Sequence, residues 1–407
     1  MTKLKDITGK ALSGEWGTDD ETGVGIPVLR TTNFTNEGIV NYENVVTRII
    51  TKKDISEKYL QSGDIIIEKS GGSDKQPVGR VIYFDGPENT YLFNNFTGLL
   101  RVRDKNEWFP RYVFYSLFAN YKKGGTRPFE NKTTGLHNLK TDDYVSRYEI
   151  TEIPLNKQVA ICAQLDQILK VINLRRKEIS NLDDLIKARF IELFGDPMTD
   201  VSKWSASTIG EQFNVSSGGT PATGEKAYWE NGTIPWIGSN MCQDTMLSEN
   251  DGKFITEEGY AHSSAKRFHK GTVLVALVGA TIGKTALLRF DTTTNQNIAA
   301  IDVTQNAAFS SEFVFYHMQM LYSKFMEIGS GKFKMANQSF IRQLPLICPP
   351  IELQEQFAAF VEQTDKSKLL SGCRLFHSWA PENRDKPKHV GVPRRRTKDL
   401  QGGRRQQ

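Results

Sequence analysis

Residues 155–194 read LNKQVAICAQ LDQILKVINL RRKEISNLDD LIKARFIELF, forty residues without a proline or a glycine. Apolar side chains recur along this stretch in alternating steps of three and four residues, which predicts a helix with a coiled-coil seam. The seam residues are Ile161, Leu165, Ile168, Ile172, Ile179, Leu182, Ile186 and Leu193. Arg175 and Arg189 interrupt the seam at two positions.

Both ends of this predicted helix carry recognisable signals. Pro154 stands before the first turn, and Gly195 with Pro197 ends the helix. At about 1.5 Å per residue, the helix is roughly 60 Å long. A helix of that length with a single apolar stripe requires a partner helix.

Length and composition limit the possible classes of protein. A chain of 407 residues is expected to form more than one domain. The sequence shows no signal-peptide core and no apolar run long enough to span a membrane, so we expect a cytoplasmic protein. The four cysteines show no C-x-x-C spacing and are expected to be reduced thiols.

The net charge of +5 comes from the C-terminal tail. Residues 371–407 contain ten Lys or Arg and three Asp or Glu, which leaves 52 − 10 = 42 basic and 47 − 3 = 44 acidic residues in the body. Any nucleic-acid surface on the body must therefore be a local patch of positive charge.

An internal repeat is visible along the chain. Matching segments recur at offsets that fall steadily from 208 to 196 residues, as they would if the second copy had shorter loops. The matched pairs are 26–28 with 234–236, 63–72 with 271–280, 77–80 with 281–284, 113–115 with 314–316, and 154–158 with 350–354.

Each copy has the pattern of a mixed α/β domain followed by a long helix. Two β-branched strands are predicted in each copy, and an aromatic-rich helix follows them. The strands are 65–67 and 81–84 in the first copy and 273–278 and 286–290 in the second, and the helices are 111–121 and 311–325.

The second long helix should begin at Ile351 and supply the partner of the first. Phe357 and Val361 match the seam positions Ile161 and Leu165. We expect the two helices to pair antiparallel and to relate the two domains by a pseudo-two-fold axis. The second helix has only the 20 residues 351–370, and the basic tail 371–407 that follows is rich in Pro, Gly and Arg and is not a helix-pairing sequence.

Three motifs resemble catalytic sites, and each is better explained as structure. Residues 279–285 resemble a phosphate-binding P-loop but have three residues between the glycines where that loop needs four. Asp64, Glu68 and Lys69 resemble a nuclease triad, but the second copy has Thr, Ala and Leu there. Residues 348–351 lack the polar and aromatic residues of an amino-methyltransferase motif, and the dispersed histidines argue against a metal site.

The polar loops before the long helices have the chemistry of DNA recognition. Residues 127–138 and 329–338 combine cations and amides with glycine. Arg and Lys bind guanine edges or phosphates, and Asn and Gln bind adenine edges. With cations at turns of the domains, the candidate DNA-binding residues are Arg30, Lys69, Arg80, Arg127, Lys132, Thr134, His137, Asn138, Lys284, Lys332, Lys334, Asn337 and Gln338.

Taken together, these features resemble a type I restriction-modification specificity subunit. The resemblance is carried by residues 218–221, 228–237, 282–285, 349–356 and 194–197, and it spans about residues 1 to 370. It implies an α+β fold with two similar target recognition domains joined by long antiparallel coiled-coil helices. The implied modules are a first recognition domain 1–154, a spacer helix 155–197, a second recognition domain 198–349, a shortened spacer helix 350–370 and the tail 371–407.

The resemblance also implies a function and partners. Each domain of such a subunit reads one half of a split double-stranded DNA sequence, and the helices dock two methyltransferase subunits, to which restriction subunits are added. The chain itself is then expected to be non-catalytic and to bind no cofactor, with S-adenosylmethionine, ATP and Mg on the partner subunits. The alternatives are a self-sufficient DNA-modifying enzyme and a coiled-coil scaffold that binds protein or sugar.

Overall fold

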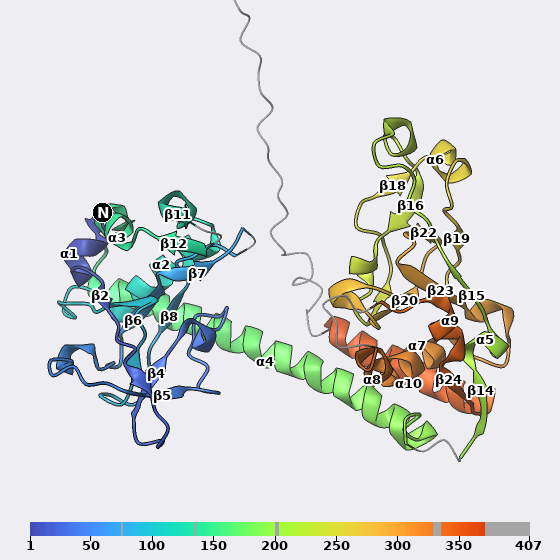
Figure 1. Cartoon of the computed structure of the whole chain (residues 1–407), viewed down its shortest axis with the longest axis horizontal. Helices are drawn as coiled ribbons and strands as arrows, with labels where there is room; N and C mark the ends of the chain where they lie inside the picture. The colour runs from blue at the N-terminus through green and yellow to red at the C-terminus, as the bar shows by residue number, and fades with distance from the viewer. Residues whose placement is uncertain (75, 134–135, 200–202, 329–334, 371–407) are drawn as a thin grey trace, which may run out of the picture. The chain divides into compact units, whose positions relative to one another are not determined.

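The computed structural model describes the chain except for residues 75, 134–135, 200–202, 329–334 and 371–407. The predicted basic tail therefore lies outside the described residues. The chain forms two compact units, Met1–Asn173 and Leu174–Gln407, which are described separately (Figure 1). Their boundary falls inside helix α4 (Leu155–Phe194), whereas the predicted modules treat the helix as a separate spacer. The difference arises because each end of α4 packs into the core of a different unit.

Unit 1 is built around an antiparallel sheet with the strand order β2-β10-β6-β8. Helix α2 covers one face of this sheet and buries Val113, Phe114 and Leu117 against it. A second sheet, β3-β5-β4-β9, contains one parallel pair, and small sheets β11-β12-β7 and β1-β13 complete the unit. The strands are β1 (Thr2–Lys3), β2 (Leu12–Ser13), β3 (Thr18–Asp19), β4 (Ile26–Leu29), β5 (Val46–Ile49), β6 (Ile65–Glu68), β7 (Ser70–Gly72), β8 (Val81–Tyr83), β9 (Leu92–Phe93), β10 (Thr97–Leu100), β11 (Glu130–Thr133), β12 (Leu136–Leu139) and β13 (Glu149–Ile150), and the helices are α1 (Leu4–Thr8), α2 (Pro110–Lys122) and α3 (Thr141–Arg147).

Unit 2 has a similar plan, with five strands in its central sheet where unit 1 has four. Its central sheet has the order β15-β23-β20-β21-β17, its second sheet is β18-β16-β22-β19, and β14 pairs with β24. The strands are β14 (Ser205–Thr208), β15 (Asn214–Ser217), β16 (Ile234–Ile237), β17 (Thr245–Leu247), β18 (Phe254–Ile255), β19 (Arg267–Phe268), β20 (Val273–Ala276), β21 (Thr285–Leu288), β22 (Thr292–Thr294), β23 (Ile298–Asp302) and β24 (Pro345–Cys348). The helices are α5 (Ile209–Gln212), α6 (Glu257–Ala261), α7 (Ser311–Met320), α8 (Tyr322–Met326), α9 (Gln338–Gln343) and α10 (Ile351–Leu370).

The predicted internal repeat is confirmed at the level of strand register. In unit 1, Leu29 of β4 pairs in parallel with Phe93 of β9, and in unit 2 Ile237 of β16 pairs in parallel with Thr294 of β22. Antiparallel pairs match as well, because β6 lies between β10 and β8 as β20 lies between β23 and β21. One expectation needs correction, since the predicted helix 311–325 is interrupted at Leu321, whose ψ of 7° ends α7 before α8 begins.

Helix α4 spans the predicted forty residues, but its buried face differs from the predicted seam. In unit 1 it buries Gln158 and Cys162, whereas the seam residues Ile161 and Ile168 are 41% and 55% exposed. The buried face is displaced by about one residue because the helix packs on the domain rather than on a second helix there. The other predicted interface residues fall into three groups. The core of unit 2 includes or contacts Ile186, Leu193, Phe357 and Val361. The edge of the core of unit 1 contacts Leu165, and the half-buried residues are Ile172, Ile179 and Leu182.

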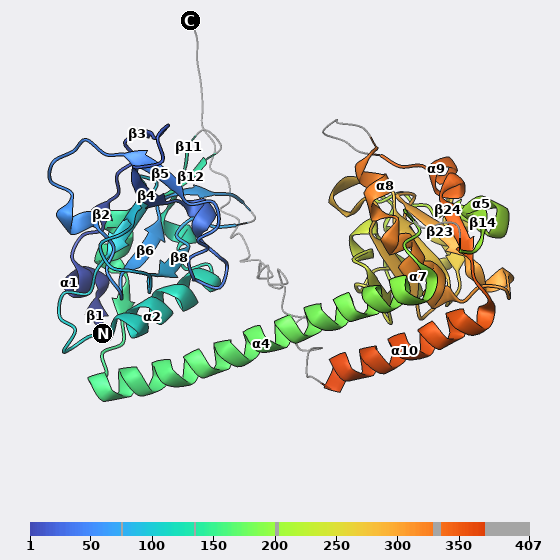
Figure 2. The same ribbon diagram turned by 90° about the horizontal axis from the view of Figure 1, so that it is seen from below.

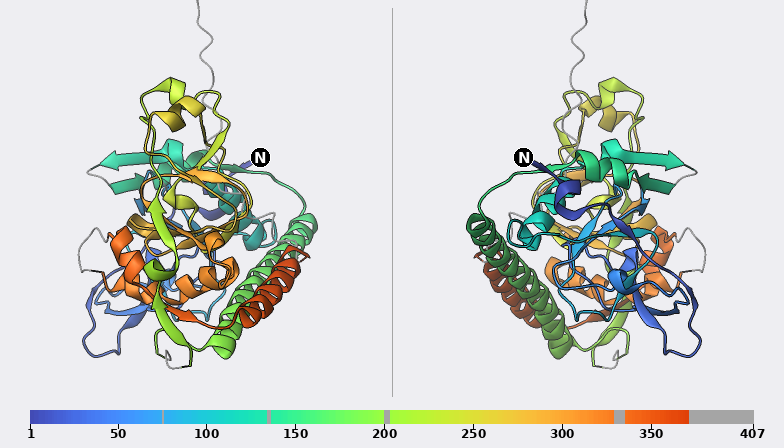
Figure 3. Two further views of the ribbon diagram at one scale, coloured as in Figure 1. Left: turned by 90° about the vertical axis from the view of Figure 1, so that its right-hand side faces the viewer. Right: turned by 90° about the vertical axis from the view of Figure 1, so that its left-hand side faces the viewer.

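Within unit 2, α10 runs antiparallel beside the last part of α4 (Figures 2 and 3). The ring of Phe357 lies 5.6 Å from that of Phe194, and one turn later Phe360 lies 6.0 Å from the guanidinium of Arg189. Phe190 and Phe194, which the seam pattern missed, are fully buried and form the centre of this contact.

Candidate nucleic-acid interface

The first predicted DNA-binding loop is folded as a β-hairpin. Residues 127–129 form a short 3-10 helix, and β11 and β12 then pair antiparallel, with Lys132 opposite His137. β12 also pairs with β7, and the register shifts between His137 and Asn138. The hairpin therefore extends a sheet of unit 1, which holds its polar residues on a fixed backbone.

Two candidates in unit 1, His137 and Arg80, have partners inside the fold. The His137 ring is 5% exposed, and its Nδ1 lies 3.1 Å from Oε2 of Glu130. The guanidinium of Arg80 donates to the carbonyl oxygens of Phe34 and Thr31 at 3.0 and 2.8 Å. Both side chains hold neighbouring segments of the unit together.

Other candidates in unit 1 remain at the surface. Arg127 is exposed, with one long bond of 3.4 Å to the Asp74 carbonyl, and Arg30 donates to the Asn44 carbonyl at 3.3 Å. Lys69 is half-buried, and its Nζ donates to Oγ of Ser13 at 3.0 Å. Asn138 is also half-buried, while the Lys132 side chain and Thr134 lie outside the described residues.

The environment of Lys69 matters for anion binding. Burial lowers the pKa of its ammonium, repulsion by Lys58 lowers it further, and attraction to Asp142 opposes these effects. A partly desolvated ammonium gains more from an electronegative atom of a ligand than a fully hydrated one does.

In unit 2, three candidates have internal partners. Lys284 pairs with Asp244 and lies over the ring of Tyr322. Asn337 caps helix α9 by accepting from the Phe340 amide at 2.8 Å. Gln338 donates to Oγ of Ser217 at 3.0 Å, and Lys332 and Lys334 lie outside the described residues.

Two exposed apolar residues, Phe96 and Met335, lie close to these candidates and were not predicted from the sequence. Phe96, in the turn between β9 and β10, is 53% exposed, and Met335, which bridges to Val278, is 68% exposed. Apolar residues near strands are usually assigned to the core. The signal that identifies Phe96 is its alignment in the repeat with the polar residue Asn297.

The segments that resemble a nuclease triad and a P-loop have structural roles in the fold. Asp64 forms a bidentate pair with Arg101 at 2.7 and 2.6 Å, and burial raises the pKa of Glu68 beside Arg80. Residues 279–281 form a short 3-10 turn ahead of β21. Among the described residues, no cluster of His, Cys, Asp and Glu is arranged to hold a metal ion, and no helix is both long and apolar enough to cross a membrane.

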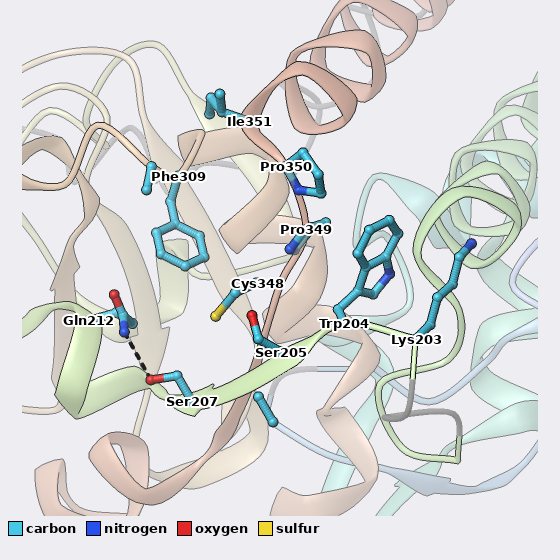
Figure 4. Close-up of a pocket in the computed structure, with 12 residues that line it drawn as sticks. Lys203, Trp204, Ser205, Ser207, Gln212, Phe309, Cys348, Pro349, Pro350 and Ile351 are labelled. Carbon is cyan, nitrogen blue, oxygen red and sulfur yellow. Dashed lines mark hydrogen bonds between the residues drawn. The ribbon is translucent and has the colours of Figure 1, made fainter.

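A pocket of about 690 Å³ lies in unit 2 where α10 begins (Figure 4). Its lining includes Phe309, Trp204 and Pro349, and Gln212 donates to Oγ of Ser207 at 3.0 Å (Figure 4). The pocket is also lined by the thiol of Cys348. Burial raises the pKa of this thiol, which makes it a poor nucleophile. The pocket therefore has the character of a packing groove beneath the start of the helix.

Comparisons with known proteins agree with this architecture. A family model described as "Type I restriction modification DNA specificity domain" matches residues 1–183 and again residues 201–372. The chain is 25% identical over 295 residues to the type I restriction enzyme EcoR124I/EcoR124II specificity subunit of Escherichia coli, a match that covers 66% of this chain and 70% of that protein. It is 28% identical over 176 residues to the MjaIX specificity subunit of Methanocaldococcus jannaschii, covering 41% of this chain and 40% of that protein.

A solved structure gives the same result for the fold. The type I restriction-modification S subunit from M. genitalium superposes with a TM-score of 0.53 at 16% identity, over 92% of this chain and 91% of that one.

Proposed function

The chain belongs to the type I restriction-modification DNA specificity family and is a DNA sequence-recognition subunit, and we propose that each of its two units reads one half of a split duplex target. The supporting observation is the repeat in strand register, which gives the chain two recognition domains with one backbone plan. Two similar domains with different surface side chains are suited to two different half-sites.

We further propose that the long helices scaffold the partners. Large apolar side chains are exposed along α4, and exposed apolar groups of this kind mark protein interaction sites. These residues are Val159, Ile161, Ile168, Val171, Leu174, Leu185 and Ile191. The partners would be two methyltransferase subunits, to which restriction subunits are added, in the cytoplasm, where the DNA lies.

The chemistry would reside on those partners. S-adenosylmethionine would bind the methyltransferase subunits, and ATP and Mg the restriction subunits, while this chain supplies sequence choice. The proposal is supported by the burial of Asp64 and Glu68, which are 1% and 3% exposed and pair with Arg101 and Arg80.

The test is co-expression of the full chain with the methyltransferase subunits of its own system, followed by mapping of methylated adenines. We expect methylation at one bipartite sequence, and no methyl transfer by the purified chain alone. Methyl transfer by the chain alone would show that it is an enzyme. Absence of any salt-dependent binding to duplex DNA would instead favour a scaffold for other ligands.

An exchange of recognition domains tests whether each unit reads its own half-site. Replacing residues up to Asp143 with the matching domain of another specificity subunit should change one half-site and leave the other half-site intact. Loss of both half-sites in a folded, assembled complex would contradict independent reading.

A further inference from the structure

In unit 1, several strand ends meet at one surface, which we call edge surface 1 and define as Ser13, Lys69, Phe96 and Asn138. The Lys69 amide donates to the Phe96 carbonyl at 2.8 Å, and the Leu139 amide donates to the Lys69 carbonyl at 2.8 Å. Asn138 pairs with Ser70, the residue after Lys69. These bonds, together with the bond of 3.0 Å from Nζ of Lys69 to Oγ of Ser13, hold the four residues beside one another.

Unit 2 has the same arrangement at edge surface 2, defined as Ser217, Leu277, Asn297 and Met335. The Leu277 amide donates to the Asn297 carbonyl at 2.9 Å, and the Ala336 amide donates to the Leu277 carbonyl at 2.9 Å. Met335 bridges to Val278, the residue after Leu277. The two backbone hydrogen bonds and the strand pairing of edge surface 1 therefore have equivalents in edge surface 2.

The serines and the adjacent glycines also match. Ser13 pairs with Gly98, and Ser217 pairs with Ala299. A Cβ on Gly14 would lie 2.2 Å from the Phe93 carbonyl oxygen, and one on Gly218 would lie 2.1 Å from the Thr294 carbonyl oxygen. The close backbone approach that only glycine permits is thus present in both units.

Against this constant backbone, three side chains differ in chemistry. Lys69 is matched by Leu277, the exposed Phe96 by Asn297, and Asn138 by the exposed Met335. Leu277 is 6% exposed and packs in the core of unit 2, so core packing accounts for the first difference. Core packing does not explain the other two, because Phe96 and Met335 are exposed and Asn138 and Asn297 are only partly covered.

We propose that the two units discriminate bases at these matched positions, through Lys69, Phe96 and Asn138 in unit 1 and through Asn297 and Met335 in unit 2, so that edge surfaces 1 and 2 read different half-sites. The inference rests on the proposed function and names the residues that carry it. Lys69 would donate to guanine O6 and N7, and Asn138 or Asn297 would bind an adenine edge. Phe96 and Met335 would contact a thymine methyl group. Leu277 offers no polar group, so unit 2 lacks the guanine contact that Lys69 makes in unit 1.

The experiment gives unit 1 the side chains of unit 2. The full chain carrying Lys69→Leu, Phe96→Asn and Asn138→Met is assembled with the methyltransferase subunits of its own system. The complex is used to select from a randomised duplex library, and the bound DNA is sequenced. Lys105→Leu, which removes an exposed lysine elsewhere in unit 1, is the matched control.

We expect the triple variant to change bases in one half-site only and to keep the other half-site and the spacer. Lys69→Leu alone should reduce discrimination in favour of guanine at one position by about 5- to 150-fold. A purely phosphate-binding Lys69 would instead weaken all sequences equally and lower the salt dependence by about one charge, which would contradict base reading by this residue.

The outcomes separate the two proposals. If the unmodified complex selects a bipartite sequence and the folded triple variant selects the same one, the inference is wrong and the proposed function stands. If the unmodified complex selects no sequence, the proposed function fails and the inference fails with it. Thermal unfolding of each variant identifies loss of fold, and Phe96→Asn alone, at an exposed position, then supplies the test.

Discussion

Nζ of Lys368 in α10 lies 2.7 Å from Oδ1 of Asp183 in α4, eleven residues beyond the contact between Phe357 and Phe194. The two contacts lie at opposite ends of the paired segment and set its antiparallel register. Asp183 is half-exposed, so the ion pair contributes little, whereas the buried phenylalanines contribute most of the stability. The last part of α4 is thereby a core element of unit 2.

Two isoleucines of α4 should respond very differently to truncation. Ile186 is fully buried and Ile168 is 55% exposed. Ile186→Ala should lower the free energy of unfolding by about 2–5 kcal/mol, because it leaves a cavity. Ile168→Ala should change it by about 0.5 kcal/mol or less. Urea unfolding of both variants checks this, and equal losses would contradict the packing described for α4.

A glutamine near the start of each long helix should be essential for stability. Oε1 of Gln354 accepts from the Ser310 amide at 2.9 Å, and its Nε2 donates to the carbonyls of Ala308 and Pro349. Gln354→Leu should cost about 1–3 kcal/mol for each buried group left unpaired. Gln356→Leu, at an exposed position on the same helix, is the control and should be nearly neutral.

Unit 1 repeats this arrangement with Gln158. Its Oε1 accepts from the Phe109 amide at 2.9 Å, and its Nε2 donates to the carbonyls of Glu107 and Ile153. We therefore expect Gln158→Leu to destabilise the chain as Gln354→Leu does. If either substitution left the free energy of unfolding unchanged, the hydrogen bonds of that glutamine would not be required for stability.

Acidification should destabilise unit 2 through His317. Burial lowers the pKa of its imidazole to about 4, and Nε2 donates to the Pro345 carbonyl at 2.8 Å. Between the ordinary pKa and this lowered one, the unfolded chain binds the extra proton. The contribution of the neutral His317 ring to the free energy of unfolding is therefore present in full above about pH 6.5. It is lost towards pH 4, and the loss amounts to up to about 3 kcal/mol.

The pH effect can be assigned by substitution. His317→Gln removes the titrating ring, so the variant should be less stable at neutral pH but should lose less stability between pH 6.5 and 4. His262→Gln, at an exposed position, is the matched control. The measurement is the unfolding midpoint of each variant across this pH range. If the midpoint of His317→Gln depends on pH as that of the unmodified chain does, His317 is not the source of the acid destabilisation.

Lengthening α4 should widen the spacer between half-sites. Four residues inserted between Arg175 and Arg176, where both side chains are exposed, add about 6 Å to the helix. With base pairs about 3.4 Å apart, the spacer should grow by one or two base pairs. Mapping of methylated sites measures the spacer, and duplication of the local turn keeps the helix intact. An active variant with an unchanged spacer would refute the role of α4 as a spacer.

The sequence by itself determined the repeat, the extent of the first long helix and the family. These features depend on local signals, such as the proline and glycine that bound α4 and the β-branched runs of β6 and β20. Such signals act over a few residues and can be read without neighbours.

Only the tertiary structure decided which side chains are available. His137, Arg80 and Lys284 carry the chemistry of DNA binding, but Glu130, Glu68 and Asp244 engage them, from positions 7, 12 and 40 residues away along the chain. The exposed face of α4 was also unpredictable, because an amphipathic helix that packs on a folded domain follows the shape of that domain rather than a regular seam. Burial and ion pairing are properties of residues brought together by folding, and sequence spacing does not record them.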